Sequence, residues 1–370
     1  MVHIFILAAA IPLFISISAH YLVFHTLVIF LKITNPSQLV ILKIIFAALS
    51  ASFIIASILI SYFSNFLVRI FYIISSVWLG ALFYLFLACL SIYLILFISQ
   101  QFSLSVSPKI MTISLLSAAA IIAGYGLLQA RNIKIKTLDL ALPNLPLEWR
   151  GKTAIYLSDL HLGQVDNNVF AARLAKLIEG QQPDLLLIGG DFYDGQTNFD
   201  LTALASEFAV IKAPLGKYFV TGNHEEFGDN GKFVSALTNA GIIFLNNRLV
   251  NINGLQLIGV DYRTAYSRKN FSEILKNLNI NKNAPSLLLR HVPDKIDIAA
   301  ANGISLMLCG HAHKGQLFPV QFIDRLIYGK YYYGLNKTGA TQVYTTSGAG
   351  TWGPPLRIMA DPEIVLIKFK

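Results

Sequence analysis

The stretch TAIYLSDLH, residues 153–161, decides the fold of the second half of the chain. Its apolar run is too short for a helix and ends abruptly in a carboxylate and an imidazole, Asp159 and His161. Four more short apolar runs end in the same way: DLLLIGGD at Asp191, KYFVTGNHE at Asn223 and His224, SLLLRH at His291, and SLMLCGHAH at His311 and His313. Short apolar runs with polar ends are typical of buried strands, so the pattern predicts a sheet with polar groups along one edge.

A helix is predicted between the first two of these strands. The segment NNVFAARLAKLIEG is amphipathic, with a polar start and a glycine stop. Strand, helix and strand at this spacing predict α/β architecture, in which a crossover places the strands side by side. Ligands of such sheets bind beyond the carboxyl ends of the strands, which is where all five polar groups lie.

The positions of the eight histidines favour a metal site. His3, His20 and His25 lie in the first apolar segment, where packing inside a helical bundle against a polar partner is expected and an intramembrane function is the alternative. The other five all lie at predicted strand ends: His161, His224, His291, His311 and His313. Histidines scattered over a surface or a core would also fall on helices, so this distribution predicts a metal site.

The first 130 residues form a different kind of domain. They contain no acidic residue and four basic ones, Lys32, Lys43, Arg69 and Lys109. A membrane-spanning helix needs about 20 apolar residues, and four segments qualify: 4–31, 39–62, 68–98 and 110–129. We expect a transmembrane domain at 1–130, a linking segment at 131–150 and an α/β domain at 151–370. Four spans are favoured over a cleaved signal peptide followed by three.

The charges place the second domain and limit its partners. Arg131, Lys134 and Lys136 follow the fourth span and favour a cytoplasmic domain, although Lys32 and Lys43 would then lie near the outer face. The chain has no arginine-rich run, so nucleic-acid binding is not predicted. Its two cysteines exclude a disulfide framework and a cysteine zinc site. The lipid bilayer is the predicted partner.

The set of candidate ligands indicates the metal chemistry. Two Asp, one Asn and five His are too many for one ion and suit two divalent ions that share a carboxylate. Mixed carboxylate and imidazole ligands suit Mn, Fe, Zn or Co better than Ca or Mg. Such a pair of ions activates water and binds two oxygens of a tetrahedral phosphorus centre, so hydrolysis of a phosphate ester is predicted.

The order of these motifs resembles a known family. SDLHLG, GGDFYDG, GNHE, LRHVPD and GHAHKGQ are similar to the successive blocks of the calcineurin-like metallophosphoesterases, over about residues 150–370. The tail VYTTSGAGTWGPPLRIMADPEIVLIKFK is similar to the membrane-associated bacterial subgroup related to YaeI and YkuE. The resemblance implies a fold with a central sandwich of two β-sheets flanked by helices.

The resemblance also implies roles for the residues of these motifs. It assigns Asp159, His161 and His313 to a first metal, Asn223, His291 and His311 to a second, and Asp191 to a bridge between them. His224 would not bind metal. It would face the substrate, stabilising the negative charge of the phosphate or protonating the leaving oxygen.

Four residues are predicted at the rim of the substrate site. Lys314 and Arg290 stand where the subgroup usually has a glycine and a small polar residue, and they would add positive charge beside the phosphate. The alternative is that they point into solvent or pair with acids such as Asp294. Gly350 belongs to a glycine-rich loop whose backbone can approach a ligand closely, and Arg357 follows that loop.

These observations together predict a membrane-anchored, binuclear metal-dependent phosphoesterase. Its expected substrate is a phosphodiester or pyrophosphate ester, with a membrane lipid of the UDP-2,3-diacylglucosamine type as a specific hypothesis. The lipid is favoured because four spans would be an unnecessarily extensive anchor for an enzyme whose substrate diffuses freely in water. The alternative is a non-catalytic sensor or scaffold in the membrane that only binds metal.

Overall fold

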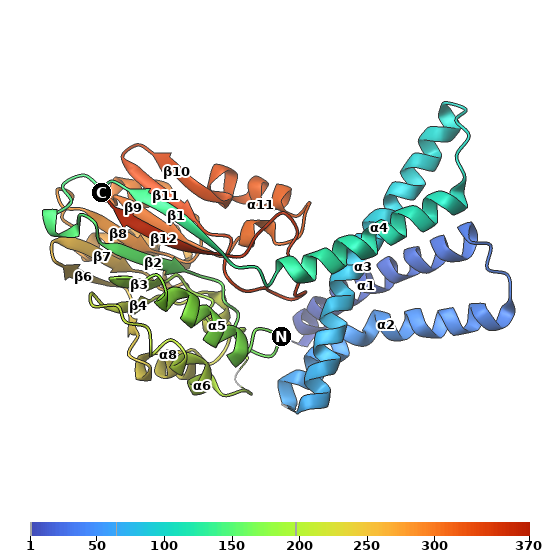
Figure 1. Cartoon of the computed structure of the whole chain (residues 1–370), viewed down its shortest axis with the longest axis horizontal. Helices are drawn as coiled ribbons and strands as arrows, with labels where there is room; N and C mark the ends of the chain where they lie inside the picture. The colour runs from blue at the N-terminus through green and yellow to red at the C-terminus, as the bar shows by residue number, and fades with distance from the viewer. Residues whose placement is uncertain (1, 64, 197) are drawn as a thin grey trace. The chain divides into compact units, whose positions relative to one another are not determined.

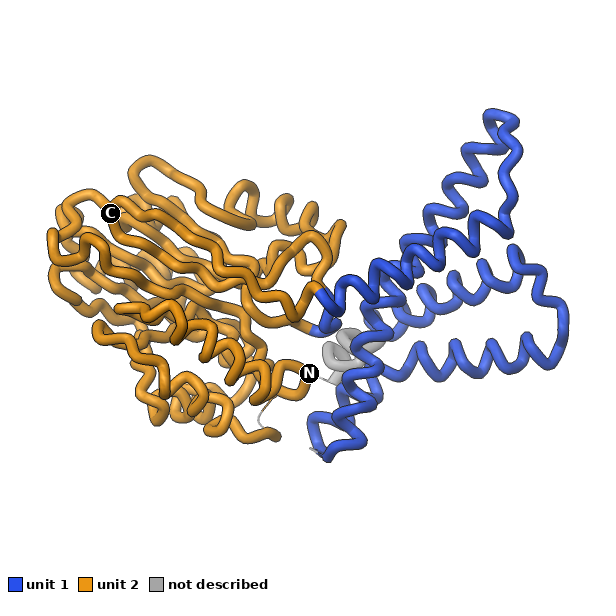
Figure 2. The backbone as a smooth tube through the Cα atoms, in the orientation of Figure 1, with its two compact units in different colours: residues 1–128, 353–356 blue, residues 129–352, 357–370 orange. Residues whose placement is uncertain are grey.

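The computed structural model describes residues 2–63, 65–196 and 198–370, with the side chains described from residue 11 onwards. The chain divides into two compact units (Figure 2). The helical unit comprises residues 1–128 and 353–356, and the phosphoesterase unit comprises residues 129–352 and 357–370. The predicted linking segment, 131–150, therefore lies inside the second unit.

The helical unit contains the four predicted spans (Figure 1). Its long helices are α1 (Val2–Phe30), α2 (Pro36–Tyr62), α3 (Phe66–Gln101) and α4 (Pro108–Gln129). Each is long and apolar enough to cross a membrane. The breaks between them supply helix caps: the Asn35 side chain accepts hydrogen bonds at the start of α2, and the Asn65 side chain accepts one at the start of α3.

Two histidines of α1 bond to polar groups of α3, as expected for interior packing. Trp78 Nε1 donates to His20 Nε2 at 2.8 Å, and His20 Nδ1 lies 2.8 Å from the Ser16 carbonyl oxygen. His25 Nδ1 lies 2.9 Å from the Tyr93 hydroxyl. The prediction that His3 also packs inside the bundle concerns a side chain that lies outside the described ones.

The phosphoesterase unit contains two six-stranded sheets. The first has the order β1-β12-β2-β3-β4-β5 and the second the order β10-β11-β9-β8-β7-β6. Strands β2, β3, β4 and β5 are parallel neighbours, as are β7, β8, β9 and β11. The strands are β1 (Lys134–Leu140), β2 (Thr153–Leu157), β3 (Leu185–Ile188), β4 (Lys217–Phe219), β5 (Ile243–Phe244), β6 (Arg248–Ile252), β7 (Leu255–Gly259), β8 (Ser286–Leu289), β9 (Leu306–Cys309), β10 (Gly334–Thr338), β11 (Thr341–Thr345) and β12 (Glu363–Phe369).

Helices cover the outer faces of both sheets. α5, α6 and α8 contribute buried side chains to a core with the first sheet, and α9 and α10 do so with the second. The helices of this unit are α5 (Asn168–Glu179), α6 (Leu201–Ser206), α7 (Asn223–Phe227), α8 (Asn230–Asn239), α9 (Arg268–Asn277), α10 (Ile296–Ala301) and α11 (Gln321–Tyr328). A third core lies between the sheets, so the unit has four layers.

The central strands β2, β3, β8 and β9 are almost entirely apolar because both of their faces are buried. In β3, Leu185 and Leu187 face the core between the sheets, while Leu186 and Ile188 face the helices. The alternation of β9 is the same, with Leu306 facing the neighbouring sheet. The predicted two-sheet sandwich flanked by helices is confirmed.

Candidate metal centre

The ends of five strands bring the predicted ligands together. Asp159 and His161 follow β2, Asp191 follows β3, Asn223 follows β4, His291 follows β8, and His311 and His313 follow β9. Five of these residues have left-handed backbones, with φ between 46° and 70°: Asp159, His161, Asp191, His311 and His313. Residues other than glycine rarely adopt this conformation, and such residues concentrate at functional sites.

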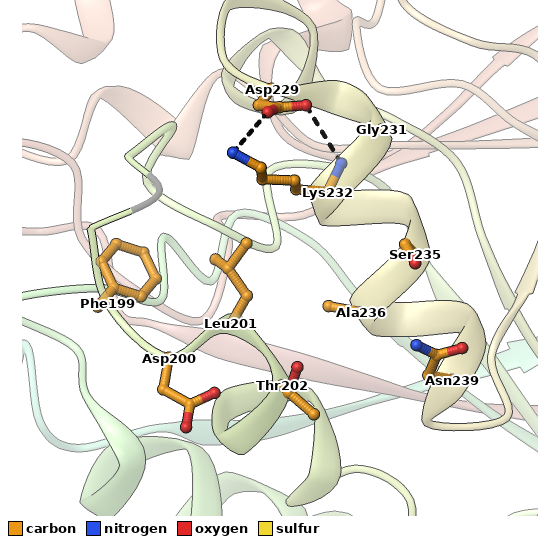
Figure 3. A pocket seen from close by; sticks show the side chains of 10 residues that line it. All are labelled: Phe199, Asp200, Leu201, Thr202, Asp229, Gly231, Lys232, Ser235, Ala236 and Asn239. Carbon is orange, nitrogen blue, oxygen red and sulfur yellow. Dashed lines mark hydrogen bonds and ion pairs between the residues drawn. The ribbon is translucent and has the colours of Figure 1, made fainter.

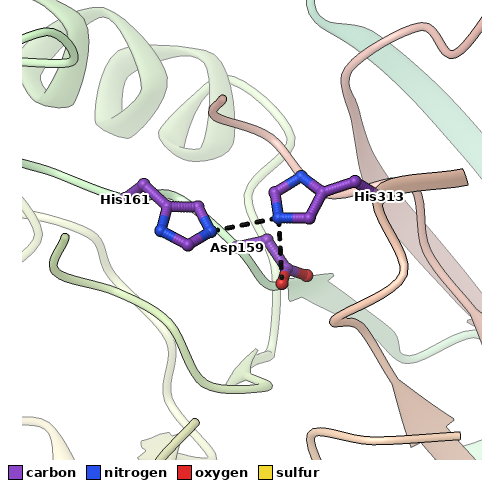
Figure 4. A group of neighbouring side chains, drawn as sticks. All are labelled: Asp159, His161 and His313. Carbon is purple, nitrogen blue, oxygen red and sulfur yellow. Dashed lines mark hydrogen bonds and ion pairs between the residues drawn. The ribbon is translucent and has the colours of Figure 1, made fainter. Parts of the chain in front are cut away.

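One cluster joins Asp159, His161 and His313, from both sheets (Figure 4). His161 Nε2 lies 3.0 Å from His313 Nε2, and His313 Nε2 lies 3.6 Å from Asp159 Oδ1. One potential ligand atom from each residue lies within 4.8 Å of the others. These are the three residues that the family resemblance assigns to a first metal.

A second cluster joins Asp191, His291 and His311. His291 Nε2 lies 3.1 Å from Asp191 Oδ2 and 3.2 Å from Asn223 Oδ1. His291 Nδ1 lies 2.9 Å from the carbonyl oxygen of Gly189, which can only accept, so Nδ1 carries the proton. Nε2 of His291 therefore faces the two oxygens, in the position of a metal ligand. Although burial opposes the shift, the Asp191 carboxylate raises the pKa of His291 to about 9.

Asp191 lies between the two clusters. Its Oδ2 is 3.1 Å from His291 Nε2 and 3.8 Å from His161 Nε2, so one oxygen faces a histidine of each cluster. Its Oδ1 accepts a hydrogen bond from the backbone N–H of His224 at 2.9 Å. This placement fits the bridging role predicted for Asp191.

The electrostatics of the clusters fit bound cations. Asp159 and Asp191 are 0% and 2% exposed, and their ion pairs within the described residues are all with histidines. Burial, with the charge of His291, lowers the pKa of His311 to about 4, so that ring is neutral at pH 7 and offers a lone pair. Buried carboxylates need a neighbouring positive charge, which divalent metal ions would supply.

Asp194 is a site residue that sequence reasoning missed. Its Oδ1 lies 3.5 Å from His161 Nδ1 and 3.6 Å from His224 Nδ1, and the three residues form a further cluster. A carboxylate at this distance fixes which nitrogen of each ring faces the centre. The available signal was its position three residues after Asp191, in the motif GGDFYDG.

Glu225 and Gly350 hold the backbone beneath the ligands. The buried Glu225 carboxylate accepts hydrogen bonds from the backbone N–H groups of Asp191, Tyr193 and Gly222 at 2.8–3.0 Å. Gly350 donates from its backbone to the Asp159 carbonyl oxygen at 2.9 Å. A Cβ atom on Gly350 would lie 1.9 Å from the Leu160 carbonyl oxygen, so only glycine fits there.

The other predicted rim residues have protein partners. The buried Arg290 guanidinium donates from Nε to Asp294 at 3.0 Å, which is the pairing named as its alternative. Lys314 Nζ lies 4.5 Å from the Tyr333 ring centre. Arg357 is fully buried, with Nη2 3.2 Å from His313 Nδ1. Arg357 therefore contacts a candidate ligand, whereas substrate contact by any of the three stays a prediction.

Trp352 is the exposed aromatic residue next to the candidate catalytic histidine. Trp352 is 58% exposed, and its ring lies edge-to-face with His224 at 6.4 Å between centres. Gln316 fixes its backbone with two hydrogen bonds of 2.9 Å. Asp166 accepts hydrogen bonds from the backbone and hydroxyl of the preceding Thr351. The loop is thus held in place while the indole stays available to a ligand.

A separate cavity of about 590 Å³ lies between α6 and α8 (Figure 3). Its two carboxylates already serve the helices, because Asp200 caps α6 and Asp229 caps α8. Asp229 also pairs with Lys232 at 3.1 Å. None of its lining residues among the described ones is a histidine, so the metal centre is the better candidate for chemistry.

Comparison with known proteins agrees with this geometry. Residues 153–315 match the family model for calcineurin-like phosphoesterases. A Helicobacter pylori metallophosphoesterase is 32% identical over 241 residues, which are 64% of this chain and 63% of that protein. A metallophosphoesterase of Aquifex aeolicus is 30% identical over 262 residues, 68% of this chain and 97% of that protein. The chain belongs to the calcineurin-like metallophosphoesterase family, as its motifs predict.

A third relative also combines the two kinds of domain. The zebrafish "transmembrane protein with metallophosphoesterase domain" is 31% identical over 275 residues, 70% of this chain and 62% of that protein. Together with the four apolar helices, this similarity supports a membrane protein. The chain spans about 62–63% of the length of the zebrafish and Helicobacter relatives.

Proposed function

We propose that the chain is a membrane-anchored hydrolase of phosphate esters that uses two divalent metal ions. The observation that carries the proposal is the pair of buried clusters on either side of Asp191, beside the partly exposed His224. The first ion would be held by Asp159, His161 and His313, and the second by Asn223, His291 and His311, with Asp191 shared. When bound, such a pair makes hydroxide available near neutral pH and stabilises negative charge on phosphate oxygens.

His224 is the proposed catalytic residue. Its Nδ1 faces Asp194, which leaves Nε2 to donate a proton to the leaving oxygen or a hydrogen bond to the phosphate. Burial and the nearby charge of His161 lower the pKa of His224. A lowered pKa makes the protonated ring a stronger acid, while the charges of Asp191 and Asp194 favour the protonated form that donates.

The decisive experiment measures hydrolysis of bis(p-nitrophenyl) phosphate by the full-length chain with Mn²⁺. We expect His224→Ala to lower kcat by about 10²- to 10⁴-fold, the usual contribution of general acid–base catalysis. Its metal content should equal that of the wild type, because His224 holds no ion in this proposal. His25→Ala, which removes a histidine of the helical unit, is the matched control.

The same assay distinguishes an enzyme from the alternative, a non-catalytic metal-binding protein. Equal activity of His224→Ala and the wild type would reject the catalytic assignment. A metal-loaded wild type that hydrolyses nothing on a broad panel of esters would favour a non-catalytic sensor or scaffold.

The proposed substrate is a phosphodiester or pyrophosphate ester of a membrane lipid, such as a nucleotide-linked diacyl sugar of the UDP-2,3-diacylglucosamine type. Four apolar helices support it, since they keep the chain in a lipid phase. The cations Arg131, Lys134 and Lys136 after α4 support a cytoplasmic location for the phosphoesterase unit. Membrane extracts incubated with the enzyme should release a phosphorylated lipid product. If soluble diesters are hydrolysed while no lipid product appears, the lipid hypothesis is wrong.

A further inference from the structure

Helix α11 exposes an apolar face to solvent. Its members are 55–86% exposed, and we call them the outer apolar face: Phe322, Ile323, Leu326 and Ile327. Because a helix turns by 3.6 residues, positions i, i+1, i+4 and i+5 lie on one side. Four large apolar side chains together on one exposed face mark an interaction surface rather than the scattered exposure normal for soluble domains.

The opposite face of α11 is attached to the metal centre. The half-buried Asp324 carboxylate lies near the backbone N–H of Gly315, which follows the ligand loop His311–His313. The Tyr328 ring lies edge-to-face with His311 at 6.2 Å between centres. A Cβ atom on Gly315 would lie 2.3 Å from the backbone nitrogen of Gln321, so the start of α11 packs directly on this loop. Whatever covers the outer apolar face therefore lies one helix away from the candidate ligands.

The charges next to this face select the kind of partner. Arg325 is exposed beside it on α11, and the exposed Lys330 follows the helix, with Nζ donating to the Lys337 carbonyl oxygen at 2.8 Å. Asp294 and Asp297, the acids that line a pocket with Ile327, are paired with the basic side chains Arg290, Lys295 and Arg268, and Asp324 lies on the opposite side of the helix. Basic side chains beside an apolar helix face are typical of helices that lie in the interface of an anionic bilayer. Apolar side chains enter the acyl boundary there, and the cations meet lipid phosphates.

The helical unit anchors the chain in a bilayer, so a short helix is sufficient to bind the phosphoesterase unit to that bilayer. The last candidate span ends at Gln129 and β1 begins at Lys134, so a linker of a few residues joins them. An extended chain gains at most about 3.5 Å per residue. An eight-residue helix binds a distant membrane weakly, but such a tether makes the contact intramolecular and raises its effective concentration.

We propose that the outer apolar face of α11 docks the phosphoesterase unit on the interface of an anionic bilayer. Docking through this helix presents the His311–His313 loop to molecules in the lipid surface. The contact does not require that the centre be catalytic, so it stands independently of the proposed function.

The test uses the full-length chain reconstituted in lipid nanodiscs that hold one copy each. Leu326→Cys carries an environment-sensitive fluorophore on the outer face, and Val169→Cys, 76% exposed on α5, is the matched control. The native Cys89 and Cys309 are buried, and labelled wild type measures their background. In discs of phosphatidylglycerol with doxyl-labelled lipid, we expect the label at position 326 to lose fluorescence. The label at position 169 should keep its fluorescence.

Companion variants show what causes the quenching. Phe322→Ser with Ile327→Ser should abolish it at position 326, because the apolar anchor is gone. Arg325→Gln should weaken it in phosphatidylglycerol and leave it unchanged in phosphatidylcholine. An unchanged Tm of these variants shows that α11 still packs on its inner face.

Three outcomes would overturn the proposal. A label at position 326 that is as unquenched and water-accessible as the label at 169 means that the face meets no lipid. A label shielded from water yet unquenched by doxyl lipid means that protein covers the face. Quenching or shielding that appears only in discs with two copies assigns the face to a second copy of the chain.

Discussion

Buried histidines occur in both units, and their surroundings differ. In the helical unit, His20 has a protein partner at each ring nitrogen: Trp78 donates to Nε2, and the Ser16 carbonyl lies at Nδ1. In the phosphoesterase unit, His161 and His313 turn Nε2 toward each other at 3.0 Å. The first arrangement is complete within the protein, whereas the second pair of rings also faces the buried carboxylates of Asp159 and Asp191, whose charge bound cations would balance.

This comparison gives a rule for separating packing from ligation. A buried histidine whose two nitrogens bond to complementary protein groups and face no carboxylate, as in His20, fastens one element to another. A histidine with one nitrogen bonded to a carbonyl and the other facing carboxylates, as in His291, is oriented for a metal. The predictions below test the rule, beginning with the largest effect.

Asp191→Asn should have the largest effect, because it removes the charge shared by both clusters. We expect kcat/KM for a soluble diester to fall by at least about 10³-fold, beyond the 10- to 100-fold typical of residues that only orient a ligand. Elemental analysis should show less metal per chain. Asp200→Asn, which preserves the cap of α6 and lies outside the centre, is the control. Full metal content in Asp191→Asn would show that Asp191 is no ligand.

Asp194→Asn should have a smaller effect on the same assay. The amide oxygen can still accept from the ring nitrogens of His161 and His224, but the negative charge is lost. We expect metal affinity or kcat/KM to fall by about 10- to 100-fold. Asp194→Ala should be worse than Asp194→Asn, because it also removes the acceptor. If both variants retain full activity and metal affinity, the contacts at 3.5 and 3.6 Å have no functional role.

The third prediction concerns stability: we expect Asp166 to make the free energy of unfolding depend on pH. Burial raises its pKa to about 6, although the hydrogen bonds from Thr351 oppose the shift. The folded chain therefore holds this proton to a higher pH than the unfolded chain, and the free energy of unfolding falls as pH rises from about 4 to about 6, by up to about 1.4 kcal/mol per unit. Above pH 6 the destabilisation is constant.

Asp166→Asn should flatten this part of the profile, because the amide keeps an acceptor for Thr351 and buries no charge. Thermal unfolding of the full chain in detergent between pH 4.5 and 7.5 measures this pH dependence of stability. Asp139→Asn, at an exposed carboxylate, is the comparison variant. The variant should be at least as stable as the wild type at pH 7.5. A variant with the wild-type slope would show that another group causes the dependence.

The sequence predicts the central strands, and the polar residues that the structure gathers at their ends, because both leave local signals. Buried strands such as β3 and β9 are short runs of apolar residues, and each ends at a polar group. The pairing of β1 with β12 is not visible locally, because it joins residues 134–140 to residues 363–369.

The geometry of the site is less predictable than its members. The left-handed backbones of Asp159 and Asp191 occur at residues for which no local rule demands them. Asp194 lies in a loop, so its approach to His161 and His224 depends on how that loop folds. The exposure of the outer apolar face also depends on tertiary packing, because an amphipathic helix in a sequence normally has a covered face.

The smallest predicted effect is in the helical unit, where the rule assigns His20 to packing. His20→Phe keeps a ring and removes both hydrogen bonds, and Trp78→Phe removes the donor. A double-mutant cycle of these variants should give a coupling of about 0.6 kcal/mol and at most about 1.7 kcal/mol, as found for hydrogen bonds between membrane helices. Unfolding of the reconstituted chain measures the coupling, and hydrolysis of a soluble diester should stay within about twofold of the wild type, below the 10-fold scale of ligand-orienting residues. A large loss of activity or of metal in His20→Phe would break the rule, because a histidine with two protein partners would then serve the chemistry of the other unit.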